Sequence, residues 1–237
     1  MNAATESMRR IELLNADAHR HLRMRAKSAA CPHFVQIVAN EFAAAAASCP
    51  ILFTKEAATG QFYAGALFGF KPAESFLPET LDRGGFNPLN LQRDGFFISG
   101  EDIAIDLDNP RFSETEGEPL FDPSQQPNAC LRQIQRVLGQ LQAGMDMTQA
   151  FIRELTSLKL IEPIDVQLNF TGGERITLEG LYTVSLDRIR ELDDASGLRL
   201  LRSGYLQLVY TMNVSLKQIP ILAHLRNQAF GPTPART

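Results

Sequence analysis

Residues 128–158 read NACLRQIQRVLGQLQAGMDMTQAFIRELTSL, and apolar side chains recur in this stretch at helical spacing. Such spacing places them on one face of an α-helix, which turns once in about 3.6 residues. The apolar positions are Leu131, Ile134, Val137, Leu138, Leu141, Met145, Phe151, Ile152, Leu155 and Leu158. Pro163 follows and ends the segment, because proline cannot continue a helix. The sequence therefore predicts a long central helix.

Several stretches outside this helix alternate between apolar and polar residues, which is the pattern of half-buried β-strands. IDVQLNFTGGERITLEGLYTV at 164–184 alternates around a Gly-Gly pair and predicts a β-hairpin. ILFTK at 51–55 and FYAGALFGF at 62–70 predict two further strands, joined by a turn. FFIS and IAIDL, within 96–107, predict a second hairpin. Antiparallel sheet pieces are thus expected on both sides of the central helix.

The C-terminal part is predicted to be helical, with a helix from Ser185 through Leu192 and another over 204–225, divided near Pro220. The expected fold class is α+β: antiparallel sheet pieces, a central helical segment and a helical C-terminal part. The expected divisions are a basic N-terminal arm at 1–30, a single domain at 31–226 with a sheet-rich half at 31–122 and a helix-rich half at 123–226, and a flexible tail at 227–237.

Charge is distributed unevenly along the chain. The net charge is −4, yet residues 1–30 carry six bases and three acids, a local charge of +3, so the remainder carries −7. The arm is expected to be a poorly anchored extension. Because the molecule as a whole is mildly acidic, nucleic acid is not an expected partner.

Cysteine usage and hydropathy indicate the compartment. The three cysteines are widely spaced, which argues against a disulfide framework and for a reducing environment. The N-terminal residues contain no apolar run of signal-peptide length, and no stretch approaches the roughly 20 apolar residues of a membrane helix. We therefore expect a cytoplasmic chain that does not span a membrane.

The common catalytic and cofactor motifs are missing from the sequence. There is no G-x-x-x-x-G-K-[ST] loop, no G-x-G-x-x-G after a strand and no G-x-S-x-G elbow. No histidine is followed two residues later by a carboxylate, which disfavours an iron(II) facial triad. His19, His21, Cys31 and His33 are the best metal-ligand set, but zinc sites usually show tighter paired spacing. Cys31 and His33 are also compatible with a nucleophilic thiolate–imidazole pair, although the sequence shows no third residue to orient the histidine. We expect neither a metal nor another cofactor.

An acidic stretch, RFSETEGEPLFD, occupies residues 111–122, with Glu114, Glu116 and Glu118 at every second position. In an extended chain these three side chains would share one face. The pattern is compatible with a solvated loop, a docking surface for a basic partner, a calcium site or a catalytic carboxylate pair. Long glutamate side chains and the immediate Pro119 disfavour calcium.

Leu120 and Phe121 are expected to pin the end of this stretch into the core, while the glutamates face solvent or a partner. The binding candidates are Glu114, Glu116, Leu120, Phe121 and Asp122.

Five segments in order carry a family resemblance: NEFAAAAASCPILFTK, FYAGALFGFKP, SETEGEPLFD, LYTVSLDRIREL and LRSGYLQLVYTMNVSL. Together they resemble the SapC family of bacterial proteins over about residues 33–226. That family is described as S-layer-related, and some members carry a peptide-transporter permease label. The resemblance implies an accessory role in envelope assembly or uptake, near genes for TonB-dependent receptors and flavin-dependent halogenases. It implies no catalytic residues.

The main functional hypothesis is a non-enzymatic binding or accessory protein whose partner is another protein. The alternative is an enzyme with a site assembled from Glu41, Lys55, Glu116 and Asp122, because a buried lysine–carboxylate set can perform acid–base chemistry. A structural role in an S-layer or another assembly is the third hypothesis, and homo-oligomerisation is left open.

Overall fold

The computed structural model describes residues 10–25, 32–72, 74–76, 81 and 84–230. These residues divide into two compact units. Unit 1 draws on residues 1–30 and 89–142, and unit 2 draws on residues 31–88 and 143–237. The boundary falls within the long helix α5 (Ala129–Ser157), so this helix contributes residues to both units.

Unit 1 contains two three-stranded antiparallel sheets, ordered β1-β7-β6 and β8-β2-β9. Its core is apolar and includes Phe96, Ile105, Leu120 and, from α5, Leu131 and Ile134. The other described elements of unit 1 are β1 (Ile11–Leu13), α1 (Ala16–His19), β2 (Arg23–Met24), α4 (Leu89–Gln92), β6 (Phe96–Ser99), β7 (Asp102–Asp106), β8 (Phe112–Ser113) and β9 (Glu118–Pro119).

Unit 2 is built on a five-stranded antiparallel sheet in the order β10-β13-β4-β5-β3, with a separate hairpin β11-β12. One face of the sheet carries Phe53, which packs against Phe151 of α5 at a centroid distance of 6.1 Å. The opposite face carries Leu52 and Leu67, which cluster with Leu222 of α9. The strands are β3 (Phe34–Gln36), β4 (Ile51–Lys55), β5 (Phe62–Leu67), β10 (Ile161–Pro163), β11 (Gln167–Asn169), β12 (Arg175–Thr177) and β13 (Tyr182–Val184).

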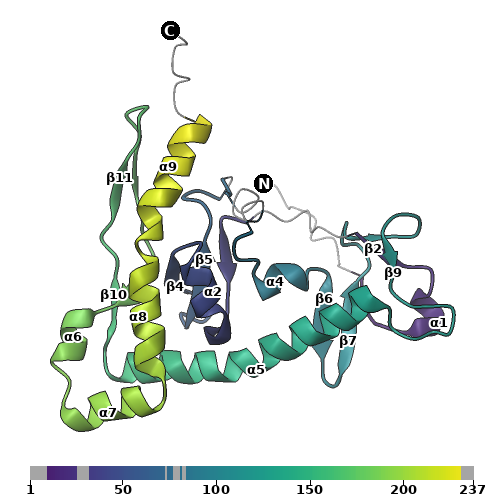
Figure 1. Ribbon diagram of the computed structural model, residues 1–237, viewed down its shortest axis with the longest axis horizontal. Helices are drawn as coiled ribbons and strands as arrows, with labels where there is room; N and C mark the ends of the chain where they lie inside the picture. The colour runs from purple at the N-terminus through teal and green to yellow at the C-terminus, as the bar shows by residue number, and fades with distance from the viewer. Residues whose placement is uncertain (1–9, 26–31, 73, 77–80, 82–83, 231–237) are drawn as a thin grey trace. The chain divides into compact units, whose positions relative to one another are not determined.

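Helices complete unit 2, and Figure 1 shows the β11-β12 hairpin alongside α9. They are the 3₁₀ turn η1 (Ala39–Glu41), α2 (Phe42–Ala46), α6 (Leu186–Arg190), α7 (Asp194–Arg202), α8 (Tyr205–Ser215) and α9 (Gln218–Phe230). No helix in the described part of the chain is both long enough and apolar enough to cross a membrane.

The α+β class is confirmed, as are the central helix, the predicted strands and both hairpins. The helical break lies at residues 216–217, and Pro220 falls in the first turn of α9, where its missing N–H has no helical acceptor to lose. The single domain expected at 31–226, with halves at 31–122 and 123–226, is instead divided between the two units, whose boundaries fall after residues 88 and 142. Two further divisions also differ from what the described residues show.

First, the described part of the basic arm is built into unit 1. Leu13 of β1 is opposite Ala104 of β7, and β2 lies between two other strands. Backbone pairing of this kind leaves no outward sign in a short, charged sequence, so an extension was expected. Second, α9 continues through Phe230 and thus includes the first residues of the expected tail.

Candidate functional site

The acidic stretch forms two short strands that enclose the N-terminal strand β2. Arg23 of β2 lies opposite Ser113 of β8 and also opposite Pro119 of β9. Between them Gly117 has a φ of +99°, and a Cβ there would lie 2.4 Å from the carbonyl oxygen of Met24. The close approach of the two backbones therefore requires glycine at this turn.

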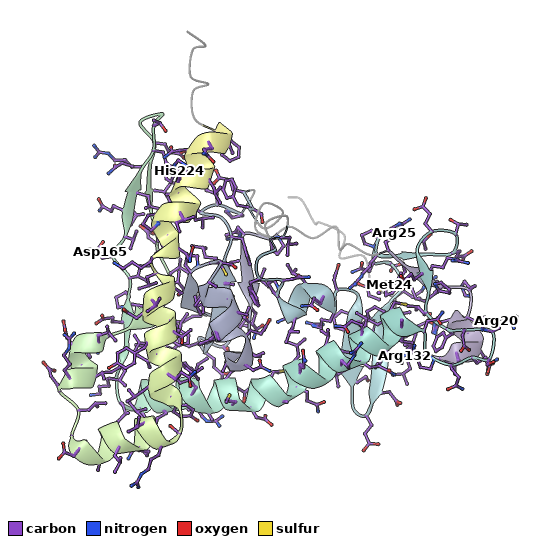
Figure 2. All side chains as sticks on the ribbon, viewed as in Figure 1. Arg20, Met24, Arg25, Arg132, Asp165 and His224 are labelled. Atoms are coloured by element: carbon purple, nitrogen blue, oxygen red, sulfur yellow. The ribbon has the colours of Figure 1, made fainter. Side chains whose placement is uncertain are left out.

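Bases of the N-terminal segment meet the glutamates. Nε of Arg25 lies 3.1 Å from a carboxylate oxygen of Glu116, and Nε2 of His21 lies 3.7 Å from Glu114. Figure 2 shows Arg25 beside Met24 of β2. Exposed ion pairs of this kind contribute only about 0–1 kcal/mol each. The acidic stretch thus already has basic neighbours within its own unit.

The end of the stretch is anchored as expected. Leu120 is fully buried and Phe121 is 9% exposed, whereas the three glutamates are exposed. Asp122 accepts hydrogen bonds from the backbone N–H groups of Ser124 and Gln126 and so stabilises a turn. Of the binding candidates, Glu114 and Glu116 present their side chains to solvent, while Leu120 and Phe121 hold the segment in place.

The four acid–base candidates of the enzyme hypothesis are divided between the two units. Glu116 and Asp122 belong to unit 1, whereas Glu41 and Lys55 belong to unit 2. The buried Glu41 carboxylate accepts a hydrogen bond from the backbone N–H of Val38 and caps η1. Lys55 is exposed, with its ammonium 4.9 Å from the ring centroid of Phe62. Each of the four therefore has a role that a local structure explains.

The two described cysteines are not nucleophiles at neutral pH. Burial, with a smaller contribution from the Glu41 charge, raises the pKa of the Cys49 thiol to about 12. Burial also raises the pKa of Cys130. A thiol must ionise to attack, so both behave as buried apolar groups.

The residues of the metal-ligand hypothesis are likewise divided between the two units. His19 is buried, its Nδ1 accepts the backbone N–H of Asn15, and its Nε2 lies 3.5 Å from Glu12. His33 belongs to unit 2, and Cys31 lies outside the described residues. Within the ranges that the structure describes, no three His, Cys, Asp or Glu side chains are grouped to hold a metal ion.

Unit 2 contains an open cavity of about 470 Å³ over one face of its sheet. That volume lies within the range of about 300–1,000 Å³ that is usual for small-molecule sites. The cavity is lined by His33, Phe34, Thr54, Tyr63, Leu67, Phe70, Thr177, Leu178, Glu179 and Leu181. These residues come from four separate segments, at 33–34, 54, 63–70 and 177–181, so no local motif marks them in the sequence.

Aromatic rings form much of the cavity wall. Phe34 and Tyr63 meet edge to face, with centroids 6.1 Å apart and an interplanar angle of 69°. The Phe34 ring lies directly over Gly65, where a Cβ would come within 2.2 Å of it. Gly65 therefore allows Phe34 to lie flat against the sheet, and the two rings form adjacent walls at a steep angle.

The cavity is negatively charged. Glu179 is the one carboxylate among the lining residues that the structure describes. Burial lowers the pKa of His33 from an ordinary value of 6.5, so this imidazole is neutral at pH 7. Burial and the nearby charge of Glu56 raise the pKa of Tyr63. Lining residues in the described part of the chain include no lysine and no arginine.

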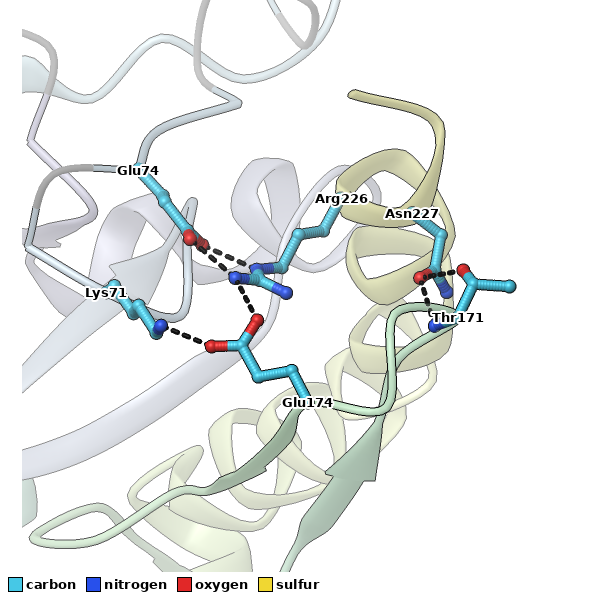
Figure 3. Close-up of polar contacts among 6 residues, drawn as sticks. All are labelled: Lys71, Glu74, Thr171, Glu174, Arg226 and Asn227. Atoms are coloured by element: carbon cyan, nitrogen blue, oxygen red, sulfur yellow. Dashed lines mark hydrogen bonds and ion pairs between the residues drawn. The ribbon is translucent and has the colours of Figure 1, made fainter. Parts of the chain in front are cut away.

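A network of charged side chains holds the β11-β12 hairpin (Figure 3), which ends at Thr177, the first of the cavity residues 177–181. Arg226 of α9 donates two hydrogen bonds of 2.7 Å to Glu74 and lies 2.8 Å from an oxygen of Glu174 in the hairpin turn. The hydrogen bonds that Arg226 donates to Glu74 raise the pKa of Arg226 further. Glu174 also pairs with Lys71, whose hydrogen bond lowers the Glu174 pKa.

The same arginine connects this network to the cavity wall. Its guanidinium lies 4.3 Å from the ring centroid of Phe170, and Phe170 contacts Phe70 of the wall at 5.8 Å. Thr171 donates its backbone N–H to Asn227 at 3.0 Å, a second link between the hairpin and α9 (Figure 3). Side chains with so many partners have little rotamer freedom, so this wall is preorganised.

Comparison with known families agrees with the resemblance in the sequence. The SapC family model matches residues 14–222. The chain belongs to the SapC family. No curated protein and no solved structure matches it significantly.

The SapC match begins at residue 14, whereas the resemblance was expected to begin at about residue 33. It therefore includes α1 and β2, the elements that lie beside the acidic stretch in unit 1. The cavity of unit 2 also lies entirely within the SapC match.

Proposed function

We propose that this SapC-family protein is a non-enzymatic binding protein that holds a ligand in the cavity of unit 2 and acts as an accessory to another protein. The cavity itself carries the proposal. It is open, of small-molecule size, lined by three aromatic rings and supported by a fixed ion-pair network.

Its chemistry favours binding over catalysis. His33 is held neutral by burial, Tyr63 is held protonated, and Thr54 donates its hydroxyl hydrogen to the carbonyl of Gly180 at 3.0 Å. Such groups can orient a ligand, whereas general acid–base catalysis works best when the pKa of the catalytic group lies near the working pH. Burial moves the pKa values of His33 and Tyr63 away from neutrality. An accessory role in envelope assembly or TonB-dependent uptake is the setting that the family resemblance favours, and the cysteine usage favours a cytoplasmic location.

A cavity-filling substitution tests the proposal. Thr177 is exposed at the edge of the cavity, so Thr177→Trp places a large ring in the binding volume with little effect on the core. Thr115→Trp, an exposed position in unit 1, is the matched control. We expect a small-molecule library screened by thermal shift to contain compounds that stabilise the wild type and the control but not Thr177→Trp. Equal stabilisation of all three would refute binding in the cavity.

A further inference from the structure

The cavity of unit 2 combines aromatic rings and a carboxylate and has no cation among its described lining residues. We infer that it binds an organic cation, a guanidinium or alkylammonium group carried by a small molecule or by a basic side chain of a partner. This inference rests on the proposed function, because it names the class of ligand for the same cavity.

The charge of the cavity supports a cation. Glu179 contributes a full negative charge at the edge, and the Glu56 charge is felt at Tyr63. His33 adds no positive charge at pH 7, since burial lowers its pKa. The Glu179 carboxylate would repel an anionic ligand. A neutral apolar ligand could pack against the rings but would make no favourable interaction with the Glu179 carboxylate.

The geometry of the rings supports the same ligand. Phe34 and Tyr63 stand at 69° to one another, and Phe70 belongs to the same wall. A cation that enters the cavity against the open face of one of these rings is attracted by the negative charge of that face, which is how aromatic side chains bind quaternary ammonium groups. Gly65 keeps Phe34 in the position that this arrangement needs.

Unit 2 already uses this chemistry within its own chain. The guanidinium of Arg226 stacks on Phe170 and is paired with Glu74 and Glu174. The cavity offers the same two components, rings and a carboxylate, on the far side of Phe70, which contacts Phe170. Arg226 is held by its two glutamates, so its guanidinium is not the cation that the cavity would bind.

Binding of four probes to the full-length protein tests the inference. Choline represents a free quaternary ammonium, and N-acetyl-arginine amide represents a peptide side chain. Their neutral counterparts are 3,3-dimethylbutan-1-ol and N-acetyl-citrulline amide. We expect isothermal titration calorimetry to show that at least one cation binds about tenfold more tightly than its neutral counterpart. The preferred cation distinguishes a small-molecule source from a basic peptide.

Two variants locate the site. Glu179→Gln removes the exposed carboxylate and should weaken cation binding about two- to fivefold, whereas Glu191→Gln, an exposed carboxylate of α6 outside the cavity, should leave it unchanged. Tyr63→Leu removes one ring and should weaken it about fivefold.

The outcomes separate the inference from the proposed function. If the neutral probes bind as tightly as the cations and Glu179→Gln has no effect, the ligand is not a cation, but the cavity still binds. If neither cation binds at millimolar concentration, the inference is wrong. If the Thr177→Trp screen also detects no cavity ligand, the proposed function fails with it.

Discussion

Arg226→Met is expected to destabilise unit 2 more than any exposed charge substitution. The arginine side chain is 6% exposed and its partner Glu74 is 11% exposed, so removal of the guanidinium leaves a nearly buried carboxylate without its bidentate donor. Methionine keeps most of the apolar volume next to Phe170, so the loss reflects mainly the charge.

The size of the effect follows from the burial of the partners. Breaking a fully buried ion pair from one side costs about 3–5 kcal/mol. Glu174 remains 38% exposed and can be solvated, which reduces the expected loss to about 2–4 kcal/mol of unfolding free energy. Arg190→Met is the matched control, because Arg190 and its partner Asp187 are 73% and 85% exposed, and it should cost less than about 1 kcal/mol.

The chain offers a selective assay. All four tyrosines, Tyr63, Tyr182, Tyr205 and Tyr210, belong to unit 2, and the sequence contains no tryptophan. Tyrosine fluorescence during urea unfolding therefore reports unit 2 without interference from unit 1. A Glu74→Gln variant completes a double-mutant cycle, in which we expect a coupling energy of about 1–3 kcal/mol. If Arg226→Met and Arg190→Met lose equal stability, the network does not hold the hairpin.

Three further predictions concern other parts of the chain. Gly117→Ala should lower hydrogen-exchange protection of residues 112–121 by about 1–3 kcal/mol, because the new Cβ meets the Met24 carbonyl at a positive φ. Gly139 lies on α5 with open space around it, so Gly139→Ala should instead stabilise the helix by about 0.5–1 kcal/mol. A loss at Gly139 equal to that at Gly117 would contradict the reasoning. Cys49 should resist iodoacetamide in the native protein at pH 8, since burial raises its pKa to about 12, and react once urea unfolds the chain; rapid native labelling by mass spectrometry would contradict this. Asp193→Ala should lower the melting temperature at pH 7, because the N-cap carboxylate accepts backbone hydrogen bonds that lower its pKa. The contribution of a group whose folded pKa is depressed is present above its unfolded pKa and is lost as pH falls through the folded value. The difference between the two proteins should therefore shrink as pH falls below the ordinary aspartate pKa of 3.8, and a constant difference would show that the carboxylate charge is not responsible.

Most of the secondary structure was predictable because its causes are local. The period of the apolar residues in α5, the Gly-Gly turn of the β11-β12 hairpin and the cap at Asp193 each depend on residues within a few positions of one another. The burial of Leu120 and the exposure of Glu116 were predicted from the same local contrast of apolar and charged residues.

The functional candidates were harder to predict because their neighbours are distant in the chain. Arg25 and Glu116 are separated by 91 residues, so the pairing of the basic N-terminal segment with the acidic stretch has no local signal. Glu41 and Lys55 were candidates on charge alone, and the structure places them in a cap and over an aromatic ring.

The sequence by itself determined the α+β class, the order of the elements and the family, and it showed that the common catalytic motifs are missing. Each of these depends on residues that lie close together in the chain. The tertiary structure decided which charges meet and where a ligand fits. Phe34, Tyr63 and Glu179 become neighbours only when β3, β5 and the segment after β12 converge over the sheet of unit 2. Convergence of that kind depends on long-range strand pairing and on the Arg226 network, and neither leaves a trace in local composition.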